Sequence, residues 1–339
     1  MKAYRLHGIN DIRYEDIEEP DIPEGWCMVK VKASGICSSD IPRVFTKGTY
    51  HFPTIPGHEF AGEVVSVNDS EHQELLGKSV GIFPLIPCRN CVACKEKKYE
   101  MCENYDYLGS RRDGGFAERV AVPIWNLIQL AEDVSMKEAA MLEPLAVALH
   151  CVRQAEIQNG ESVAVVGSGM IGFAVAKWAK LEGATKVVVY GQSEAKRTIA
   201  NAVDCEYMTL EEGSSDKTNY DVVIEAAGSE VSIDLAINMV VAGGKLVLMG
   251  NPAGDIKLNQ NTYWRILRKQ LKVIGTWNSS YNGVRESDWT RVRDALVDGS
   301  LNVSLFITHV FKQDELEDAL ELMREHKEMY CKVLVEWNE

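Results

Sequence analysis

A short apolar run followed by a glycine-rich turn is the feature that most limits how this chain can fold. The run Ser162–Val166 is typical of a strand buried on both faces, and the turn and an amphipathic stretch to about Glu182 follow it. In such a unit the first glycine makes the turn, the second lets the backbone approach a pyrophosphate and the third lets the helix pack on the sheet. We therefore expect a dinucleotide to bind at the helix N-terminus, on Gly167, Gly169, Met170, Ile171 and Gly172.

The residues after this turn alternate between strand and helix patterns. Strand-like runs lie at 186–190, 221–224 and 245–249, with helical stretches between them. This alternation predicts an α/β domain with a doubly wound parallel sheet, a Rossmann domain, over residues 151–284.

The first 150 residues have a different pattern. Short runs such as Trp26–Ala33 and Phe60–Val67 show strand-type patterns without helical periodicity, which favours an antiparallel, barrel-like domain. Beyond residue 284 come two helical patterns, at 287–297 and 313–325, and a strand at 332–337. No second nucleotide motif occurs there, so we expect residues 285–339 to return and complete the domain formed by residues 1–150.

Charge and cysteine content limit the partners and the compartment. The chain of 339 residues carries a formal net charge of −14, which argues against a nucleic-acid surface and against adhesion to anionic membranes. No apolar stretch approaches the ~18 residues that span a bilayer, and no apolar segment follows Met1. We expect a cytoplasmic protein, in which clustered cysteines bind metal rather than form disulfides.

Three separated stretches suggest a catalytic metal site. His58 and Glu59 stand side by side after Gly57, and Cys37 lies upstream of them. Glu143 precedes Pro144 in an apolar segment, where we expect the proline to interrupt a helix and the carboxylate to need a partner. Mixed thiolate, imidazole and carboxylate ligands with one open position are the arrangement of catalytic zinc.

Two side chains beside Cys37 suit supporting roles. The hydroxyl of Ser39 could bond an alcohol oxygen and relay its proton, and Asp40 could hold the far nitrogen of His58. Turn or helix-cap chemistry is the alternative for both residues.

Four cysteines within 15 residues indicate a second, structural metal site. Their spacing allows four thiolates to close around one tetrahedral zinc ion. Iron–sulfur proteins use similar runs, but their fourth cysteine usually comes sooner and is followed by proline. Polar residues between these cysteines suggest an exposed lobe that a metal stabilises. The cysteines are Cys88, Cys91, Cys94 and Cys102.

The residues after the second predicted strand bear on cofactor choice. An NAD site usually has an acidic residue there to bind the ribose hydroxyls, but Gly191 occupies the expected position. Gln192 and Ser193 can donate to a 2′-phosphate, and Lys196 or Arg197 can neutralise it. The sequence thus favours NADP over NAD, with an acidic role for Glu194 as the alternative.

Adjacent arginines follow the cysteine segment. Arg111 and Arg112 lie in a glycine-bounded turn of an otherwise acidic chain, where they could bind a substrate phosphate. A salt-bridged loop is the equally weighted alternative.

Together these motifs, in this order along essentially the whole chain, resemble the zinc-dependent medium-chain dehydrogenase/reductase family. Glu143-Pro144-Leu145 is similar to its polyol dehydrogenase branch, and residues 105–118 and 274–278 to members acting on galactitol 1-phosphate. This chain departs from these relatives at Gly191, where they have an aspartate. The resemblance implies a GroES-like catalytic domain beside the Rossmann domain, two zinc ions per subunit and a homodimer or homotetramer.

The resemblance also implies roles for the candidate residues. Cys37, His58 and Glu143 would hold the catalytic zinc, Glu59 would be an alternative ligand, and Ser39 would relay the proton. The expected reaction is hydride transfer between the secondary alcohol of a polyol or polyol phosphate and NAD(P), giving a ketose or ketose phosphate. Alternatives are a sorbitol-, ribitol- or threonine-type dehydrogenase, or a non-catalytic NADP(H)-binding protein.

Overall fold

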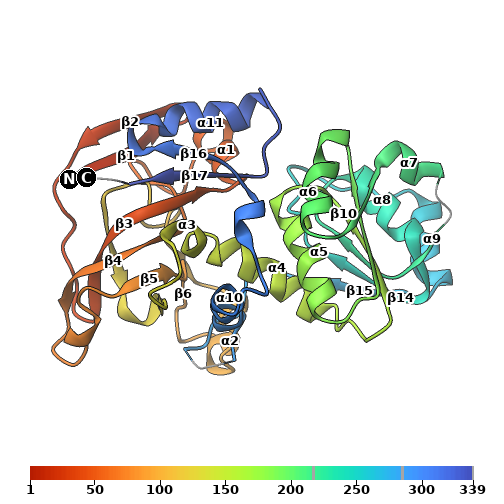
Figure 1. Ribbon diagram of the computed structural model, residues 1–339, viewed down its shortest axis with the longest axis horizontal. Coiled ribbons are helices and arrows are strands. Elements are labelled where there is room, and N and C mark those ends of the chain that lie inside the picture. Colours follow the sequence, from red (N-terminus) through yellow and green to blue (C-terminus); the bar gives the residue numbers. More distant parts are fainter. Residues whose placement is uncertain (216–217, 284–285, 338–339) are drawn as a thin grey trace. The chain divides into compact units, whose positions relative to one another are not determined.

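The computed structural model describes residues 1–215, 218–283 and 286–337, and the chain divides into two compact units (Figure 1). Unit 1 contains Met1–Pro144 and Ser280–Glu339, and unit 2 contains Leu145–Ser279. The boundary between the first segment of unit 1 and the start of unit 2 falls inside helix α4 (Leu142–Gln154). The domain boundaries inferred from the sequence, 150/151 and 284/285, stay a prediction, and residues 284 and 285 lie outside the described residues.

A six-stranded parallel sheet forms the centre of unit 2, with the strand order β12-β11-β10-β13-β14-β15. Its central strand, β10, is the apolar run before the glycine turn, and four of its five residues are buried. The strands are β10 (Ser162–Val166), β11 (Lys186–Gly191), β12 (Glu206–Thr209), β13 (Tyr220–Glu225), β14 (Val240–Leu248) and β15 (Lys272–Gly275).

Helices cover both faces of this sheet, as the strand–helix alternation of the sequence predicts. Figure 1 shows α5 and α6 on one face and α8 and α9 on the other. The central strands are therefore covered on both sides, which explains their continuous apolar sequence. The helices are α5 (Met170–Leu181), α6 (Arg197–Ala202), α7 (Leu210–Ser215), α8 (Glu230–Met239) and α9 (Gln260–Arg268).

Unit 1 is built on a seven-stranded, mostly antiparallel sheet with the order β16-β17-β3-β4-β5-β9, in which β8 also pairs with β3. The hairpin β1–β2 and the pair β6–β7 complete its strands. The bounds are β1 (Lys2–Gly8), β2 (Asp11–Asp16), β3 (Trp26–Ile36), β4 (Glu59–Asn68), β5 (Ser79–Ile82), β6 (Leu85–Ile86), β7 (Asp106–Tyr107), β8 (Arg119–Pro123), β9 (Leu127–Gln129), β16 (Ile307–Lys312) and β17 (Lys332–Glu336). The predicted class, a β-rich unit beside a doubly wound one, is confirmed.

Three neighbouring strands of this sheet bring distant residues together. Strand β3 ends immediately before Cys37, β4 begins with Glu59, and β17 begins with Lys332. Gly35 of β3 pairs with Glu59 on one side and with Leu334 of β17 on the other. Trp337, which follows β17 and is buried, donates from Nε1 to Ser34 Oγ at 3.1 Å. The last described strand is therefore tied to the strand that leads into the candidate site.

One helix differs from the sequence-based expectation. Pro144 was expected to interrupt a helix, but it lies in the first turn of α4, where a missing N–H costs no intrahelical bond. The interruption comes earlier, between α3 (Met136–Ala139) and Leu142. The remaining α-helices of unit 1 in the described ranges are α1 (Asp40–Pro42), α2 (Val92–Lys95), α10 (Asp288–Val297) and α11 (Leu316–Glu325). Within the described ranges, no helix has both the length and the apolar character to cross a bilayer.

Candidate active site

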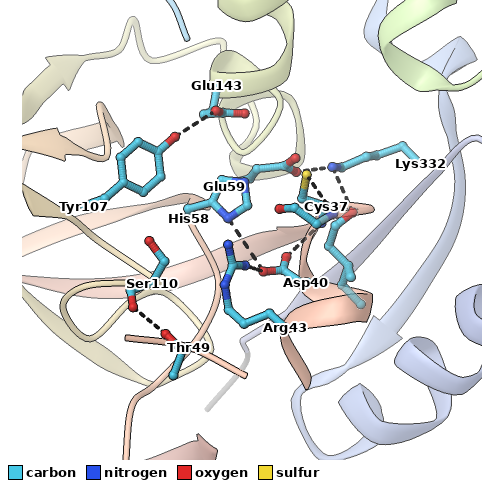
Figure 2. Close-up of polar contacts among 12 residues, drawn as sticks. Cys37, Asp40, Arg43, Thr49, His58, Glu59, Tyr107, Ser110, Glu143 and Lys332 are labelled. Atoms are coloured by element: carbon cyan, nitrogen blue, oxygen red, sulfur yellow. Dashed lines mark hydrogen bonds and ion pairs between the residues drawn. The ribbon is translucent and has the colours of Figure 1, made fainter. Parts of the chain in front are cut away.

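Cys37, His58 and Glu59 lie together at the ends of β3 and β4 (Figure 2). One ligand atom from each residue lies within 4.8 Å of the other two. His58 and Glu59 are buried, and the thiol of Cys37 accepts a hydrogen bond from the amide of Ser39 at 3.5 Å. The structure thus brings together three of the four residues proposed from the sequence as metal ligands.

The carboxylate of Asp40 lies behind His58 and is completely buried. It accepts a hydrogen bond from the Cys37 amide at 2.9 Å and another from Arg43. Its Oδ1 atom lies 3.7 Å from His58 Nδ1, which is an ion-pair distance rather than a hydrogen bond. Burial lowers the pKa of His58, but the charges of Asp40 and Cys37 outweigh it and raise that pKa well above its ordinary value.

Glu143, the fourth proposed ligand, belongs to the first turn of α4 and is also buried. Its Oε1 accepts a hydrogen bond from the hydroxyl of Tyr107 at 3.2 Å, and the Tyr107 ring lies 5.8 Å from the His58 ring. Burial raises the pKa of Glu143 to about 7. A nearby cation would favour its ionised form.

Lys332 is the buried cation of this region. Its Nζ donates to Glu59 Oε2 and, at 3.1 Å, to the carbonyl of Ile36. Although burial opposes the charged amine, Glu59 and Cys37 raise the pKa of Lys332 above its ordinary value. Figure 2 shows this side chain reaching Glu59 from the strand on the far side of β3.

The charges of the site fit a divalent metal ion. When His58 is neutral, as a metal ligand must be, and the other groups are ionised, the acidic groups Cys37, Asp40, Glu59 and Glu143 exceed the cations Arg43 and Lys332 by two negative charges. Buried charges of this kind are tolerated only when they are paired or bind a metal. The donor set of thiolate, imidazole and carboxylate is one that zinc accepts. The site residues are therefore compatible with zinc in both charge and chemistry.

Ser39 stands at the N-terminus of α1 but does not cap it. Its side chain makes no capping hydrogen bond, although the residue does lie in the turn that precedes α1, so the proton-relay role stays a prediction. The side chain is partly exposed beside Cys37. It therefore remains available to a substrate alcohol.

The four clustered cysteines also converge. Their sulfur atoms all lie within 4.8 Å of one another, and the Cys88–Cys94 and Cys91–Cys102 distances are both 3.9 Å. A tetrahedron with metal–sulfur bonds of ~2.3 Å has edges of about 3.8 Å, so the arrangement matches a zinc site.

The environments of these thiols differ when no metal is considered. Backbone amides of Asn90 and Cys91 lower the pKa of Cys88 to about 6, whereas burial raises that of Cys94 to about 12. A dication would stabilise all four thiolates at once. The lobe is anchored by Arg89, whose guanidinium lies 4.5 Å from the ring of Trp125.

The glycine turn of unit 2 has the expected geometry. Gly167 has a φ of +133°, which favours glycine, and its amide donates to the carbonyl of Tyr190 at 2.8 Å. A Cβ atom at Gly172 would overlap the Gly167 carbonyl, whereas nothing lies within 4 Å of one at Gly169. The backbone at Gly169 is therefore open to a close ligand. Met170 and Ile171 begin α5 directly after it.

An acidic side chain at the end of β11 would have to displace neighbouring hydroxyl groups. A Cβ atom at Gly191 would overlap the hydroxyls of Ser168 and Tyr207. Gln192 and Ser193 are exposed, as a phosphate contact requires.

Arg197 is already partnered by carboxylates. It donates to Glu194 Oε2 at 2.9 Å and to Glu212 Oε2 at 3.2 Å. A 2′-phosphate would have to compete with both carboxylates for this guanidinium. The alternative considered for Glu194, an acidic contact to the ribose, stays a prediction.

The two adjacent arginines have different surroundings. Arg112 forms an exposed ion pair with Asp106. The Arg111 guanidinium lies between two aromatic rings, 4.5 Å from the centre of Tyr50 and 4.2 Å from that of Tyr105, and donates to the Tyr105 carbonyl at 2.6 Å. Within the described ranges no carboxylate forms an ion pair with Arg111. Arg111, rather than Arg112, is the better candidate for an anion.

Sequence reasoning did not identify Tyr107 or Lys332. The available signals were a tyrosine within residues 105–118 and a lysine at the start of an apolar terminal strand. Neither indicates which buried carboxylate it contacts. Tyr107 is 36 residues from its partner Glu143, and Lys332 is 273 residues from Glu59.

Two family models match the chain. The model described as alcohol dehydrogenase GroES-like domain matches residues 23–132, and the one described as zinc-binding dehydrogenase matches residues 171–298. Between them they cover most of both structural units.

Two curated relatives differ in what they act on. Galactitol 1-phosphate 5-dehydrogenase of Escherichia coli K12 is 31% identical over 290 residues, which are 83% of this chain and 84% of that protein. L-threonine 3-dehydrogenase of Pyrococcus furiosus is 30% identical over 334 residues, 92% of each chain. Similar identities to enzymes with different named substrates leave the substrate of this chain open.

Similar solved structures hold both nicotinamide cofactors. A zinc-binding dehydrogenase from Sinorhizobium meliloti 1021 bound to NADP has a TM-score of 0.90 at 27% identity, over 99% of this chain and 98% of that one. An alcohol dehydrogenase from E. coli CFT073 complexed with NADH has a TM-score of 0.90 at 25% identity, over 99% of both chains.

The cysteine lobe yields the first prediction. Cys91→Ser should lower the zinc content of the purified protein from two ions to one per chain, because three thiolates and a neutral hydroxyl hold the ion less well. Metal analysis measures the content, and limited proteolysis should show earlier cleavage within residues 88–102. Cys205→Ala, outside both clusters, is the control and should retain two ions. A Cys91→Ser protein that retains both ions would contradict the proposed site.

Proposed function

The chain belongs to the zinc-dependent medium-chain dehydrogenase/reductase family, and we propose that it transfers a hydride between the secondary alcohol of a polyol or polyol phosphate and NAD(P). The products would be a ketose or ketose phosphate and NAD(P)H, with release of one proton. The observation that carries the proposal is the convergence of Cys37, His58 and Glu59 on one point, with the buried carboxylate of Glu143 at the start of α4 as a further candidate ligand.

Each candidate residue of unit 1 would have its own role in the reaction. Cys37, His58 and Glu143 would hold zinc, which when bound lowers the pKa of an alcohol. Asp40 would orient His58 from behind, so that Nε2 rather than Nδ1 faces the metal. Ser39 would accept a hydrogen bond from the substrate hydroxyl and pass its proton towards solvent. The cysteine lobe would hold a second, structural zinc ion.

The preference for a phosphorylated polyol is supported by Arg111. A guanidinium held between two rings, without a carboxylate partner in the described ranges, is oriented and unneutralised. Such a group suits a phosphate. The adjoining Tyr105 ring lies 6.0 Å from that of Tyr107, which contacts Glu143. Arg111 thus connects through two aromatic rings to the metal site. A sorbitol-, ribitol- or threonine-type activity is the competing proposal.

The substrate proposal predicts that Arg111→Met lowers kcat/KM for galactitol 1-phosphate by about 10- to 100-fold, the usual strength of a hydrogen bond to a charged group. Activity on free galactitol should be unchanged. Initial rates at saturating cofactor measure both substrates. Arg112→Met is the matched control and should change neither rate by more than about twofold, because its exposed ion pair contributes little. Equal wild-type rates with free polyols and their phosphates would refute the phosphate preference.

We propose NADP as the favoured cofactor. Gly191 leaves no acidic group at the end of β11, and Gln192, Ser193 and Arg197 lie beside it. Glu194 would have to release Arg197 when the 2′-phosphate binds. The negative charge of Glu194 therefore opposes the binding of NADP. A variant without this charge distinguishes the NADP assignment from the NAD assignment.

Glu194→Gln should raise kcat/KM for NADP severalfold and leave that for NAD unchanged, because a neutral amide no longer competes for Arg197. Steady-state rates with each cofactor measure the effect. Thr198→Ala, which replaces the exposed residue next to Arg197, is the control. A wild-type preference for NAD that is lost in Glu194→Gln would instead assign the ribose contact to Glu194.

We also propose a homodimer or homotetramer and a cytoplasmic location. Strand β15 is one of the two edges of the parallel sheet, and Val273 on it is 45% exposed. Trp277, just beyond it, is also exposed. A second copy pairing along this edge would cover both residues. None of the nine cysteines, all of which lie in the described ranges, forms a disulfide, as a reducing compartment favours. Microscopy of a fluorescent fusion would test the location.

Val273→Lys should weaken the assembly, because two lysines would then oppose each other without water at the contact. Sedimentation velocity should show a shift from oligomer to monomer at micromolar concentration. Val231→Lys is the control on α8, where the side chain is 71% exposed. An assembly unchanged by Val273→Lys would place the contact elsewhere.

A further inference from the structure

Glu225, the last residue of β13, holds two turns of unit 2 together. The residue is 1% exposed, and its Oε1 accepts hydrogen bonds from the amides of Ala227 at 2.8 Å and Gly228 at 2.7 Å. Its backbone carbonyl accepts from the amides of Met249 at 2.9 Å and Gly250 at 3.0 Å, which follow β14. One residue thus fixes four amides at the carboxyl ends of two neighbouring strands.

The turn after β13 packs closely against the turn after β14. Gly228 has a φ of +73°, which favours glycine, and a Cβ atom there would lie 2.7 Å from the Asn251 carbonyl oxygen. A Cβ atom at Gly250 would overlap the Gly228 nitrogen and lie 2.6 Å from Glu225 Oε2. No described residue donates a hydrogen bond to this second oxygen. The hold of the carboxylate on the turn therefore depends on Oε1.

The two amides that face Glu225 determine where the neighbouring carbonyls point. Across a trans peptide the N–H and the preceding C=O point in opposite directions. The amides of Ala227 and Gly228 point inwards to a buried carboxylate, so the carbonyls of Ala226 and Ala227 point away from it. Ala227 is exposed, and neither carbonyl accepts a hydrogen bond from another described residue. This turn therefore presents two unused acceptors.

The same turn lies where a dinucleotide would cross the sheet. The strand order changes direction between β10 and β13, and ligands of such sheets bind outside the carboxyl ends at that point. A Cβ atom at Gly167 would lie 3.0 Å from the carbonyl carbon of Ala226, so this turn adjoins the glycine turn. A cofactor with its adenosine ribose at β11 and its pyrophosphate at α5 extends its nicotinamide half over β13.

We propose that Glu225 is a positioning residue for the nicotinamide half of the cofactor, because it turns the carbonyls of Ala226 and Ala227 outwards as hydrogen-bond acceptors. The ribose hydroxyls and the carboxamide of that half are donors, which a carbonyl can accept and a backbone amide cannot. Glu225 acts through the turn and touches no reacting atom. The role rests on the proposed cofactor site at the glycine turn and is independent of the substrate.

Glu225→Ala removes the acceptor for both amides and tests this role. The dissociation constant for NADPH should rise about tenfold, because the released amides no longer hold the carbonyls outwards. ADP contains the adenosine ribose and the pyrophosphate but lacks the nicotinamide half, so its dissociation constant should stay within about twofold of wild type. Fluorescence titration measures NADPH binding, and calorimetry measures ADP binding. NADH replaces NADPH if the wild-type protein binds NADH more tightly.

Two further variants separate this effect from a general loss of stability. Glu225→Gln keeps an oxygen for both amides and should bind NADPH within about threefold of wild type. Asp221→Ala is the matched control, because Asp221 lies near the other end of β13 and also accepts two hydrogen bonds, from the amide and hydroxyl of Ser162 at 2.8 and 2.7 Å. It should lower the unfolding temperature and leave both dissociation constants unchanged.

A Glu225→Ala protein that binds NADPH as tightly as wild type, or that loses NADPH and ADP equally, would overturn the proposal. If this variant fails to fold, Glu225→Asp takes its place. A carboxylate that is one methylene shorter withdraws its oxygens from the two amides and should show the same selective loss. A wild-type protein that binds neither NADPH nor NADH would refute the proposed function and this role together.

Discussion

Buried negative charge in unit 1 is the constraint on which the candidate site depends. Cys37, Asp40, Glu59 and Glu143 lie close to one imidazole, and three of these four side chains are nearly inaccessible to water. Such a cluster is stable only with compensating charge. The fold supplies Arg43 from the segment after α1 and Lys332 from the last strand, and the remaining charge matches one divalent ion. The pairing of β17 with β3 is thus part of the chemistry of the site.

Features encoded over a few residues could be predicted from the sequence. The glycine turn is one, because Gly167 and Gly172 have local steric reasons that the structure reproduces, and Gly169 leaves the open backbone that the pattern predicts. The cysteine lobe is another, since short spacing forces the thiols to converge. Gly191 could be recognised as a departure from an acidic position, and the structure adds the cause: Ser168 and Tyr207 fill the space. The fold class and the family followed from these motifs, and both are confirmed.

Features that depend on strand pairing or on the exact start of a helix could not be predicted in this way. The partner of Glu59 lies 273 residues away and is set by the order β17-β3-β4, which no local pattern encodes. Pro144 looked like a helix break because proline usually ends helices, yet in the first turn of α4 it is tolerated. For Arg197, the sequence showed a cation where a phosphate could bind. It did not show that Glu194 and Glu212 already hold the guanidinium.

The two candidate metal sites place opposite demands on their surroundings. In the cysteine lobe the four sulfur atoms are equivalent ligands at similar distances, so nothing has to choose among them. The site at Cys37 contains chemically similar glutamates from β4 and α4, and a metal alone would gain by binding both. Glu59 meets the buried ammonium group of Lys332, whereas Glu143 meets the neutral hydroxyl of Tyr107, so the two carboxylates have different electrostatic surroundings.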